Sequence, residues 1–385
     1  MNKTKISQSD LELNFLKKIN HLTSEITVDK EKKFHLDSYV YEKIKLFPKT
    51  RFYGSKKRLL SWIYENIKEL EFNTVLDGFG GTSSVSLLFK AMKKNLTYND
   101  ILNSNTISAN TLLLSEIPIS LVNAEKFIES ISPKKGIVYK NFHNVFFNDE
   151  ENMWIDGAME NILSLSNVKQ RNLFLYCLFQ SCLMKRPFNI FHRANLNLRT
   201  NKEIKRSFGN LTTWNTSFEI LMKKNLLEIY RFIWDSNTKT KVLKSKSIEK
   251  IEKGYDLVYL DPPYISKINN TDGYLKKYHF LEGLSDYNNW ENMIDYNSSI
   301  KMLSSHKYNS DWENKYKFKE KLFNLISYHK SSIVVLSYVN NAVPSIKELM
   351  DFFEDNFSKV TINTYSLSHA LAKDKRNEIL IIGEP

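Results

Sequence analysis

The side chains with the clearest chemical potential follow a short apolar stretch at residues 257–260. Asp261, Pro262, Pro263 and Tyr264 come directly after it. The apolar stretch predicts a strand buried on both faces. The two prolines end that strand, because neither can donate a ladder hydrogen bond. Asp261 is therefore expected at the carboxyl end of a central strand, where open α/β sheets bind their ligands.

This arrangement suits a reaction at an exocyclic amine of a nucleobase, whose lone pair is delocalised into the ring. The Asp261 carboxylate and the carbonyl oxygen of Pro262 can accept the two N–H groups of that amine. Tyr264 offers a flat face for a base taken out of the stack. The alternative interpretation is structural: a strand end, a turn and a packed tyrosine.

A glycine-rich turn earlier in the chain predicts a cofactor cradle. Gly78, Gly80 and Gly81 lie between the strand-like residues 74–77 and the helical pattern that begins near residue 84. Small residues at such a turn let the backbone approach a ligand closely. The turn lacks the Gly-Lys-Ser/Thr ending of a nucleotide P-loop.

Two further segments fit a cofactor site. Ser55 can cap the helix that follows it. The free backbone N–H groups at the start of that helix, together with Lys56, can bind a carboxylate. The alternative is that this helix start is only a solvent-exposed cap with no ligand. Asp100 ends a second predicted strand, one βαβ step beyond Asp77, where a carboxylate can accept ribose hydroxyls. The alternative for Asp100 is a cap of the next helix, which would use the same oxygens.

Together these segments resemble known motifs. Asp-Pro-Pro-Tyr at 261–264 resembles the catalytic motif of the DNA amino-methyltransferases that use S-adenosylmethionine. Asp77-Gly78-Phe79-Gly80-Gly81 resembles their motif I, with Ser83 where the final glycine usually stands. Tyr53-Gly54-Ser55-Lys56 resembles motif X, which contacts the methionine carboxylate. The motif order over residues 49–385 resembles the α-class adenine-N6 DNA methyltransferases of the D12 (Dam-like) family.

The resemblance implies a Rossmann-like α/β fold: a seven-stranded sheet with helices on both faces, an antiparallel last strand and an inserted, mostly helical target-recognition domain. It also implies direct methyl transfer from S-adenosylmethionine to N6 of adenine, with no metal. The expected catalytic residues are Asp261, Pro262, Pro263 and Tyr264. The expected cofactor-binding residues are Tyr53, Gly54, Lys56, Asp77, Phe79, Gly80, Gly81, Asp100 and Asp261.

Between the cofactor motifs and the catalytic motif lies a basic stretch. Residues 185–250 contain 15 lysines and arginines and five acidic residues. Arginine, asparagine and histidine hold phosphates and read base edges; the alternative is a solvated loop with core phenylalanines. The residues expected to bind double-stranded DNA are Lys185, Arg186, Asn189, His192, Arg193, Asn195 and Arg199.

Composition agrees with a DNA-binding globular protein. The chain has 385 residues, a formal net charge of +12 and 42% hydrophobic residues. The charge favours an anionic partner, although a lysine-rich composition explains part of it. Two cysteines and a polar N-terminus predict a cytoplasmic protein, with no membrane partner and a monomeric state.

We expect four segments: an N-terminal extension at 1–48, the cofactor-binding part at 49–140, the target-recognition insertion at 141–240 and the catalytic part at 241–385. The commonest setting of the family is a restriction-modification system, so the resemblance implies a modification enzyme with a cognate endonuclease encoded nearby. Three alternatives stay open: cytosine-N4 transfer, an RNA substrate and a catalytically silent DNA-binding subunit.

Overall fold

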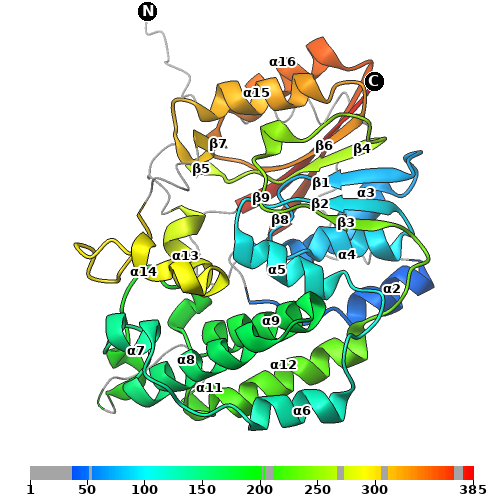
Figure 1. The fold of residues 1–385 in the computed structure, drawn as a ribbon. Coiled ribbons are helices and arrows are strands. Elements are labelled where there is room, and N and C mark those ends of the chain that lie inside the picture. The colour runs from blue at the N-terminus through cyan, green and yellow to red at the C-terminus, as the bar shows by residue number, and fades with distance from the viewer. Residues whose placement is uncertain are drawn as a thin grey trace, which may run out of the picture. The chain divides into compact units, whose positions relative to one another are not determined.

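The computed structural model describes residues 37–51, 54–201, 203, 211–266, 273–304, 311–367 and 376–385. The contact pattern separates residues 1–35 from residues 36–385, and the fold below is that of the second unit (Figure 1). Residues 1–36 of the predicted N-terminal extension and the predicted cofactor residue Tyr53 lie outside the described residues.

A seven-stranded sheet forms the centre of this unit, with the strand order β3-β2-β1-β4-β6-β9-β8. Among the described residues, β9 runs antiparallel to both of its neighbours, β6 and β8, and the other pairs of this sheet are parallel. This confirms the predicted seven-stranded fold with its antiparallel last strand. The strands are β1 (Thr74–Asp77), β2 (Asn95–Tyr98), β3 (Thr240–Val242), β4 (Leu257–Leu260), β6 (Ile333–Val339), β8 (Lys359–Leu367) and β9 (Arg376–Glu384).

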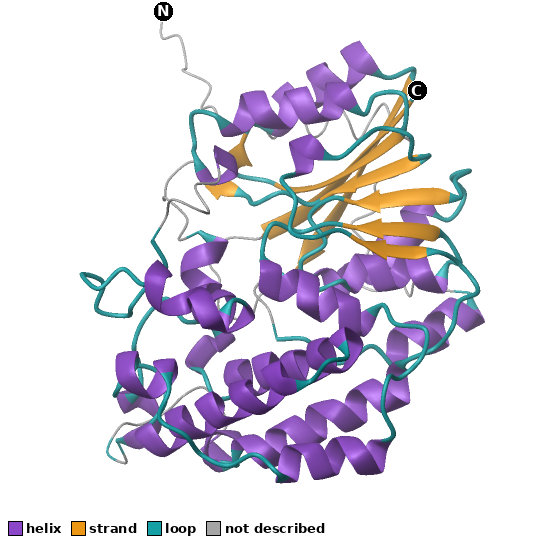
Figure 2. Cartoon of the chain, viewed as in Figure 1, coloured by secondary structure: helices purple, strands orange, loops and turns teal. Residues whose placement is uncertain are grey.

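Helices cover both faces of the sheet, as Figures 1 and 2 show. The sheet is apolar on both sides as a result: all four residues of β4 are buried. Parallel strands are usually buried on both faces, so helices must pack on each side of such a sheet. On one face lie α15 (Phe318–Tyr328) and α16 (Ile346–Asn356); on the other lie α4 (Ser84–Ala91) and α5 (Asn103–Leu112).

A helical layer lies between β2 and β3 in the sequence. Its central helix α9 is almost wholly buried and packs on α12 and α5. Because α6 also packs on α12, this layer includes residues before 141, the predicted start of the insertion. Its helices are α6 (Leu121–Glu129), α7 (Ile137–Asn141), α8 (Asp149–Ser164), α9 (Val168–Met184), α10 (Asn197–Thr200), α11 (Leu211–Asn215) and α12 (Phe218–Phe232).

The remaining elements are short or peripheral. None of the helices within the described ranges has both the length and the apolar character to cross a bilayer. The remaining elements are α2 (Ser38–Lys45), α3 (Leu60–Ile67), α13 (Tyr274–Ser285), α14 (Trp290–Met293), the paired strands β5 (Ile265–Ser266) and β7 (Ala342–Val343), and the 3-10 turns η1 (Lys56–Leu59), η2 (Pro187–Asn189), η3 (Ile248–Lys250), η4 (Tyr287–Asn289) and η6 (Asp311–Glu313).

Candidate active site

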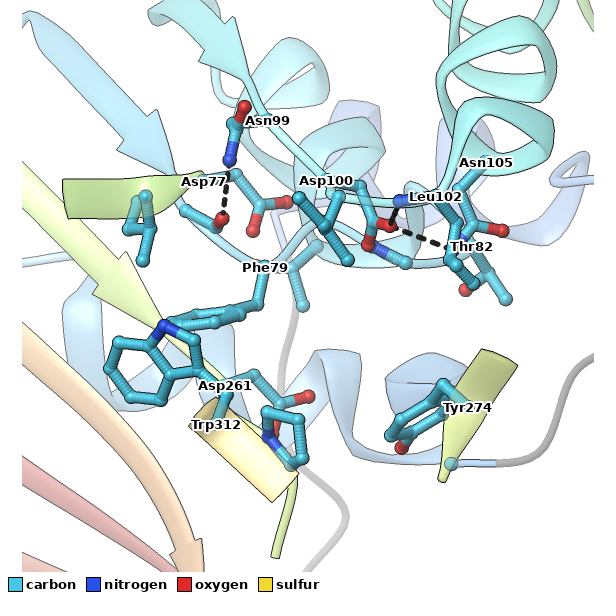
Figure 3. A pocket seen from close by; sticks show the side chains of 18 of the residues that line it. Asp77, Phe79, Thr82, Asn99, Asp100, Leu102, Asn105, Asp261, Tyr274 and Trp312 are labelled. Carbon is cyan, nitrogen blue, oxygen red and sulfur yellow. Dashed lines mark hydrogen bonds between the residues drawn. The ribbon is translucent and has the colours of Figure 1, made fainter. Parts of the chain in front are cut away.

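The carboxyl ends of β1, β2 and β4 meet at a cavity of about 320 Å³ (Figure 3). That volume lies at the lower end of the range for small-molecule sites, about 300–1,000 Å³. The cavity therefore brings together segments that are far apart in the sequence. The predicted site residues that line it are Gly54, Lys56, Asp77, Phe79, Gly80, Gly81, Asp100, Asp261 and Pro263.

The turn after β1 requires small residues. A Cβ at Gly80 would overlap the ring of Tyr98, and the Tyr98 hydroxyl donates a hydrogen bond to the carbonyl oxygen of Gly81 (2.8 Å). Ser83 has φ 61°, in the left-handed region that glycine adopts without strain. This explains why the family motif usually has glycine at that position, and it identifies Ser83 as a strained residue.

Asp77 is buried at the end of β1, and the Ser86 hydroxyl donates to its Oδ2 (2.5 Å). Burial raises the pKa of Asp77 to about 7, with a further contribution from the charges of Asp261 and Asp100. Within the described part of the chain, its Oδ1 has no hydrogen-bond partner. A donor on a bound molecule would supply that partner.

Asp100 bonds to the start of the helix that follows it and also lines the cavity. Its Oδ1 accepts from the backbone N–H of Leu102 (2.8 Å) and from Asn105 Nδ2 (3.1 Å), at the start of α5. Its Oδ2 accepts from the backbone N–H of Gly81 (2.9 Å), and the residue lines the cavity. Burial raises the pKa of Asp100 to about 6, against the effect of these hydrogen bonds.

Asp261 follows β4 directly, and its carboxylate lies in a network of charged and phenolic groups. Its Oδ1 accepts a hydrogen bond from the Tyr264 hydroxyl (2.5 Å) and lies 3.0 Å from Lys56 Nζ. Lys56 Nζ also donates to the Tyr264 hydroxyl (2.6 Å) and lies 3.6 Å from Oε2 of Glu378. Lys56 therefore faces the predicted catalytic carboxylate.

Charge balance explains why this lysine is stable inside the protein. Burial disfavours the Lys56 ammonium, but the carboxylates of Asp261 and Glu378 outweigh that effect and raise the pKa of Lys56 above its usual value. Glu378 is nearly buried on β9, and our sequence analysis missed it. Its only signal in the sequence is an acid inside an otherwise apolar terminal strand.

Three residues predicted to bind DNA are held inside the helical layer instead. The side chains of Lys185 and Arg199 both pair with Glu151, at 2.8 and 2.7 Å. Arg186 is buried, donates to backbone carbonyl oxygens and lies over the ring of Phe146. The prediction that Lys185, Arg186 and Arg199 contact DNA is therefore not supported: their contacts stabilise the insertion itself.

The other predicted DNA-binding residues are more accessible. Arg193 is exposed, whereas Asn189, His192 and Asn195 are half-buried. Asn189 and Asn195 have positive φ angles of 57° and 52°, which asparagine tolerates better than most residues. Phe191 is buried against Phe280, so part of this stretch is core, as the alternative interpretation proposed.

A glycine cradle beside a strand-end acid, on a sheet of this order, defines a Rossmann-like methyltransferase. The chain belongs to the D12 class of N6 adenine-specific DNA methyltransferases: the family model matches residues 52–350. It is thus an adenine-specific DNA methyltransferase, and the cytosine-N4 and silent-subunit alternatives are not favoured.

Two relatives agree with this assignment. The chain is 27% identical over 350 residues to the Type II methyltransferase M2.HphI of Haemophilus parahaemolyticus, covering 88% of this chain and 98% of the relative. It is 25% identical over 343 residues to the modification methylase LlaI of Lactococcus lactis subsp. lactis, covering 82% of this chain and 51% of the relative.

Proposed function

We propose that this enzyme transfers a methyl group from S-adenosylmethionine to N6 of an adenine within one specific sequence of double-stranded DNA. The observation that carries the proposal is that Asp261, at the end of β4, lines the same cavity as the glycine turn at Gly80 and Gly81. A methyl donor held by the turn would therefore lie next to the group that receives the adenine.

The residues of the cavity fit S-adenosylmethionine. The backbone of the turn is open to close approach at Gly81, where a Cβ would meet nothing nearer than 3.8 Å, and Asp100 lies where ribose hydroxyls are held in doubly wound sheets. Asp77 keeps one unpartnered oxygen for a donor. When bound, the cofactor supplies a methyl group already activated by its sulfonium, so the protein's contribution is positioning and electrostatics.

Asp261 and the carbonyl oxygen of Pro262 would accept the two N6 hydrogens of a flipped adenine. Lys56 holds the Asp261 carboxylate in a fixed direction, since its ammonium lies 3.0 Å away. Tyr264 would carry the base on its ring after its hydroxyl leaves Asp261. The methylated N6 would carry one positive charge, and it would return to neutrality by releasing one proton to solvent along its hydrogen bond to Asp261.

DNA would bind across the insertion through Asn189, His192, Arg193 and Asn195. The names of both relatives refer to restriction-modification enzymes, so we propose the same setting for this chain, with a separate endonuclease as partner. A cytoplasmic monomer remains our prediction.

The direct test is expression in a host that lacks adenine methylation, followed by long-read sequencing of its DNA. We expect N6-methyladenine within a single sequence motif, and none in cells that carry Asp261→Asn. Modified cytosine, or unmodified DNA in cells that contain folded wild-type protein, would overturn the proposal.

A further inference from the structure

A short turn between β4 and β6 forms one wall of the cavity. In η6, Trp312 packs edge-to-face on Phe79, with ring centroids 5.0 Å apart and ring planes at 74°. Both side chains line the cavity (Figure 3). Two aromatic rings on the wall of a ligand site offer apolar, polarisable surface, which suits a flat ring better than a charged chain.

The indole of Trp312 is fixed by a residue that also lines the cavity. Its Nε1–H donates to Oε1 of Glu249 (2.9 Å), and Lys321 Nζ donates to the same oxygen (2.8 Å). Glu249 lies in η3, on the segment that follows β3. The ring is therefore already oriented before a ligand binds, and little conformational entropy is lost on binding.

The next residue anchors the same turn on its other side. Oε1 of Glu313 accepts the backbone N–H of Tyr274 at the start of α13 (2.8 Å). A Cβ at Gly273 would overlap the Glu313 carboxylate. Glu313 can therefore lie this close to the start of α13 only because residue 273 is glycine. The turn is thus held at two points, η3 and α13, and both carry residues that line the cavity.

The position of Trp312 indicates which part of a ligand it meets. If Asp100, after β2, holds the ribose, the attached base lies toward the segment after β3. Ile101, Ile248 and Glu249 line the cavity there, and Glu249 is the hydrogen-bond partner of Trp312. Resting on the proposed function, we infer that Trp312 packs against the purine ring of the cofactor and determines the affinity for its adenosine end.

Calorimetric titration with S-adenosylhomocysteine and with adenosine tests this inference without requiring turnover. Trp312→Ala should weaken both ligands by a similar factor of about 10- to 100-fold, the range that follows from losing one aromatic stacking partner. Trp312→Phe should recover most of the affinity because it keeps an aromatic face. Trp154→Ala is the matched control: Trp154 stacks on Phe218 in the helical layer and does not line the cavity.

Fluorescence gives a second readout in case the alanine variant does not fold. Saturating S-adenosylhomocysteine should change the tryptophan emission of the wild type and of Trp154→Phe, and most of that change should be missing in Trp312→Phe. Unaltered affinity in folded Trp312→Ala, or an undiminished emission change in Trp312→Phe, would overturn the inference. A wild type that binds no S-adenosylhomocysteine would instead refute the proposed cofactor.

Discussion

Lys56 Nζ lies 3.0 Å from Oδ1 of Asp261, although one residue begins η1 and the other follows β4. A turn expected to bind the methyl donor is thus joined directly to the group expected to bind the acceptor base. The groups proposed to bind the two substrates of the reaction therefore share one ion pair. It also fixes the carboxylate before either substrate arrives, which lowers the cost of reorganisation during transfer.

Replacing Asp261 tests the catalytic assignment. Asp261→Ala should reduce methyl transfer by about 100-fold or more, the scale of losing one oriented electrostatic contact in an active site. The fold should persist because Lys56 keeps Glu378 as a partner. Incorporation of labelled methyl into duplex DNA measures the effect, and calorimetry with S-adenosylhomocysteine checks that cofactor binding survives. Wild-type incorporation by the variant would remove Asp261 from the mechanism.

Asp77 predicts how stability depends on pH. Its folded pKa is about 7, above the usual 3.8 of the unfolded chain. Between these values the unfolded state loses its proton first, so stability should fall as pH rises from about 4 to 7. Asp77→Asn should remove this part of the slope and make the protein more stable than the wild type at pH 8.

Urea unfolding at pH 5 and pH 8 measures that difference. Asp351→Asn, at an exposed position on α16, provides the control and should keep the wild-type slope. An identical slope in Asp77→Asn would show that Asp77 does not carry the shift. Asp100, whose pKa is about 6, should add a smaller dependence of the same sign in both variants.

Two arginines of the insertion should behave in opposite ways. Arg193→Ala should weaken DNA binding by about 1–3 kcal/mol if the side chain contacts a base, and leave stability within about 0.5 kcal/mol. Arg199→Ala should destabilise the fold by about 1–3 kcal/mol, because it removes one of the two cations that pair with Glu151.

Fluorescence anisotropy with a duplex that contains the target sequence, together with urea unfolding, separates the two effects. Raising the salt concentration should weaken binding by the wild type steeply. If Arg193→Ala binds DNA as tightly as the wild type, the residue does not belong to the DNA-contacting surface.

Ser83 predicts a stabilising substitution. Its φ of 61° costs a non-glycine residue about 1–2 kcal/mol, whereas glycine adds up to about 1 kcal/mol of unfolded-state entropy. Ser83→Gly should therefore raise the free energy of unfolding by up to about 1 kcal/mol. Thermal and urea unfolding measure it, with Ser86→Gly, inside α4, as a control that should destabilise. A less stable Ser83→Gly would show that the serine side chain contributes more than its backbone costs.

Much of the sheet could be predicted because its strands are short apolar runs ended by prolines, glycines or acids. The predicted strands before Gly78 and before Asp261 both follow from this pattern, and β1 and β4 confirm them. The three-residue β3 was not predicted, since its sequence Thr-Lys-Val carries too little pattern. Such a strand depends on its pairing with β2.

The side-chain contacts of the site were harder to predict, because they depend on packing. The sequence around a basic residue does not show whether its partner is a DNA phosphate or a buried carboxylate. The buried roles of Lys185 and Arg199 could therefore not be distinguished from the exposed position of Arg193. Trp312 and Glu378 lie far in sequence from every motif. Only the fold brings them to the cavity and to Lys56.

The hydrogen bond from the Tyr264 hydroxyl to Asp261 has a consequence for fidelity. An entering base must first displace the Tyr264 hydroxyl, and the amino group of a base can return an N–H donor to Asp261 in its place. A base that offers no donor there would leave Asp261 Oδ1 with Lys56 alone, so the resting contact favours an amino-bearing base at the moment of entry.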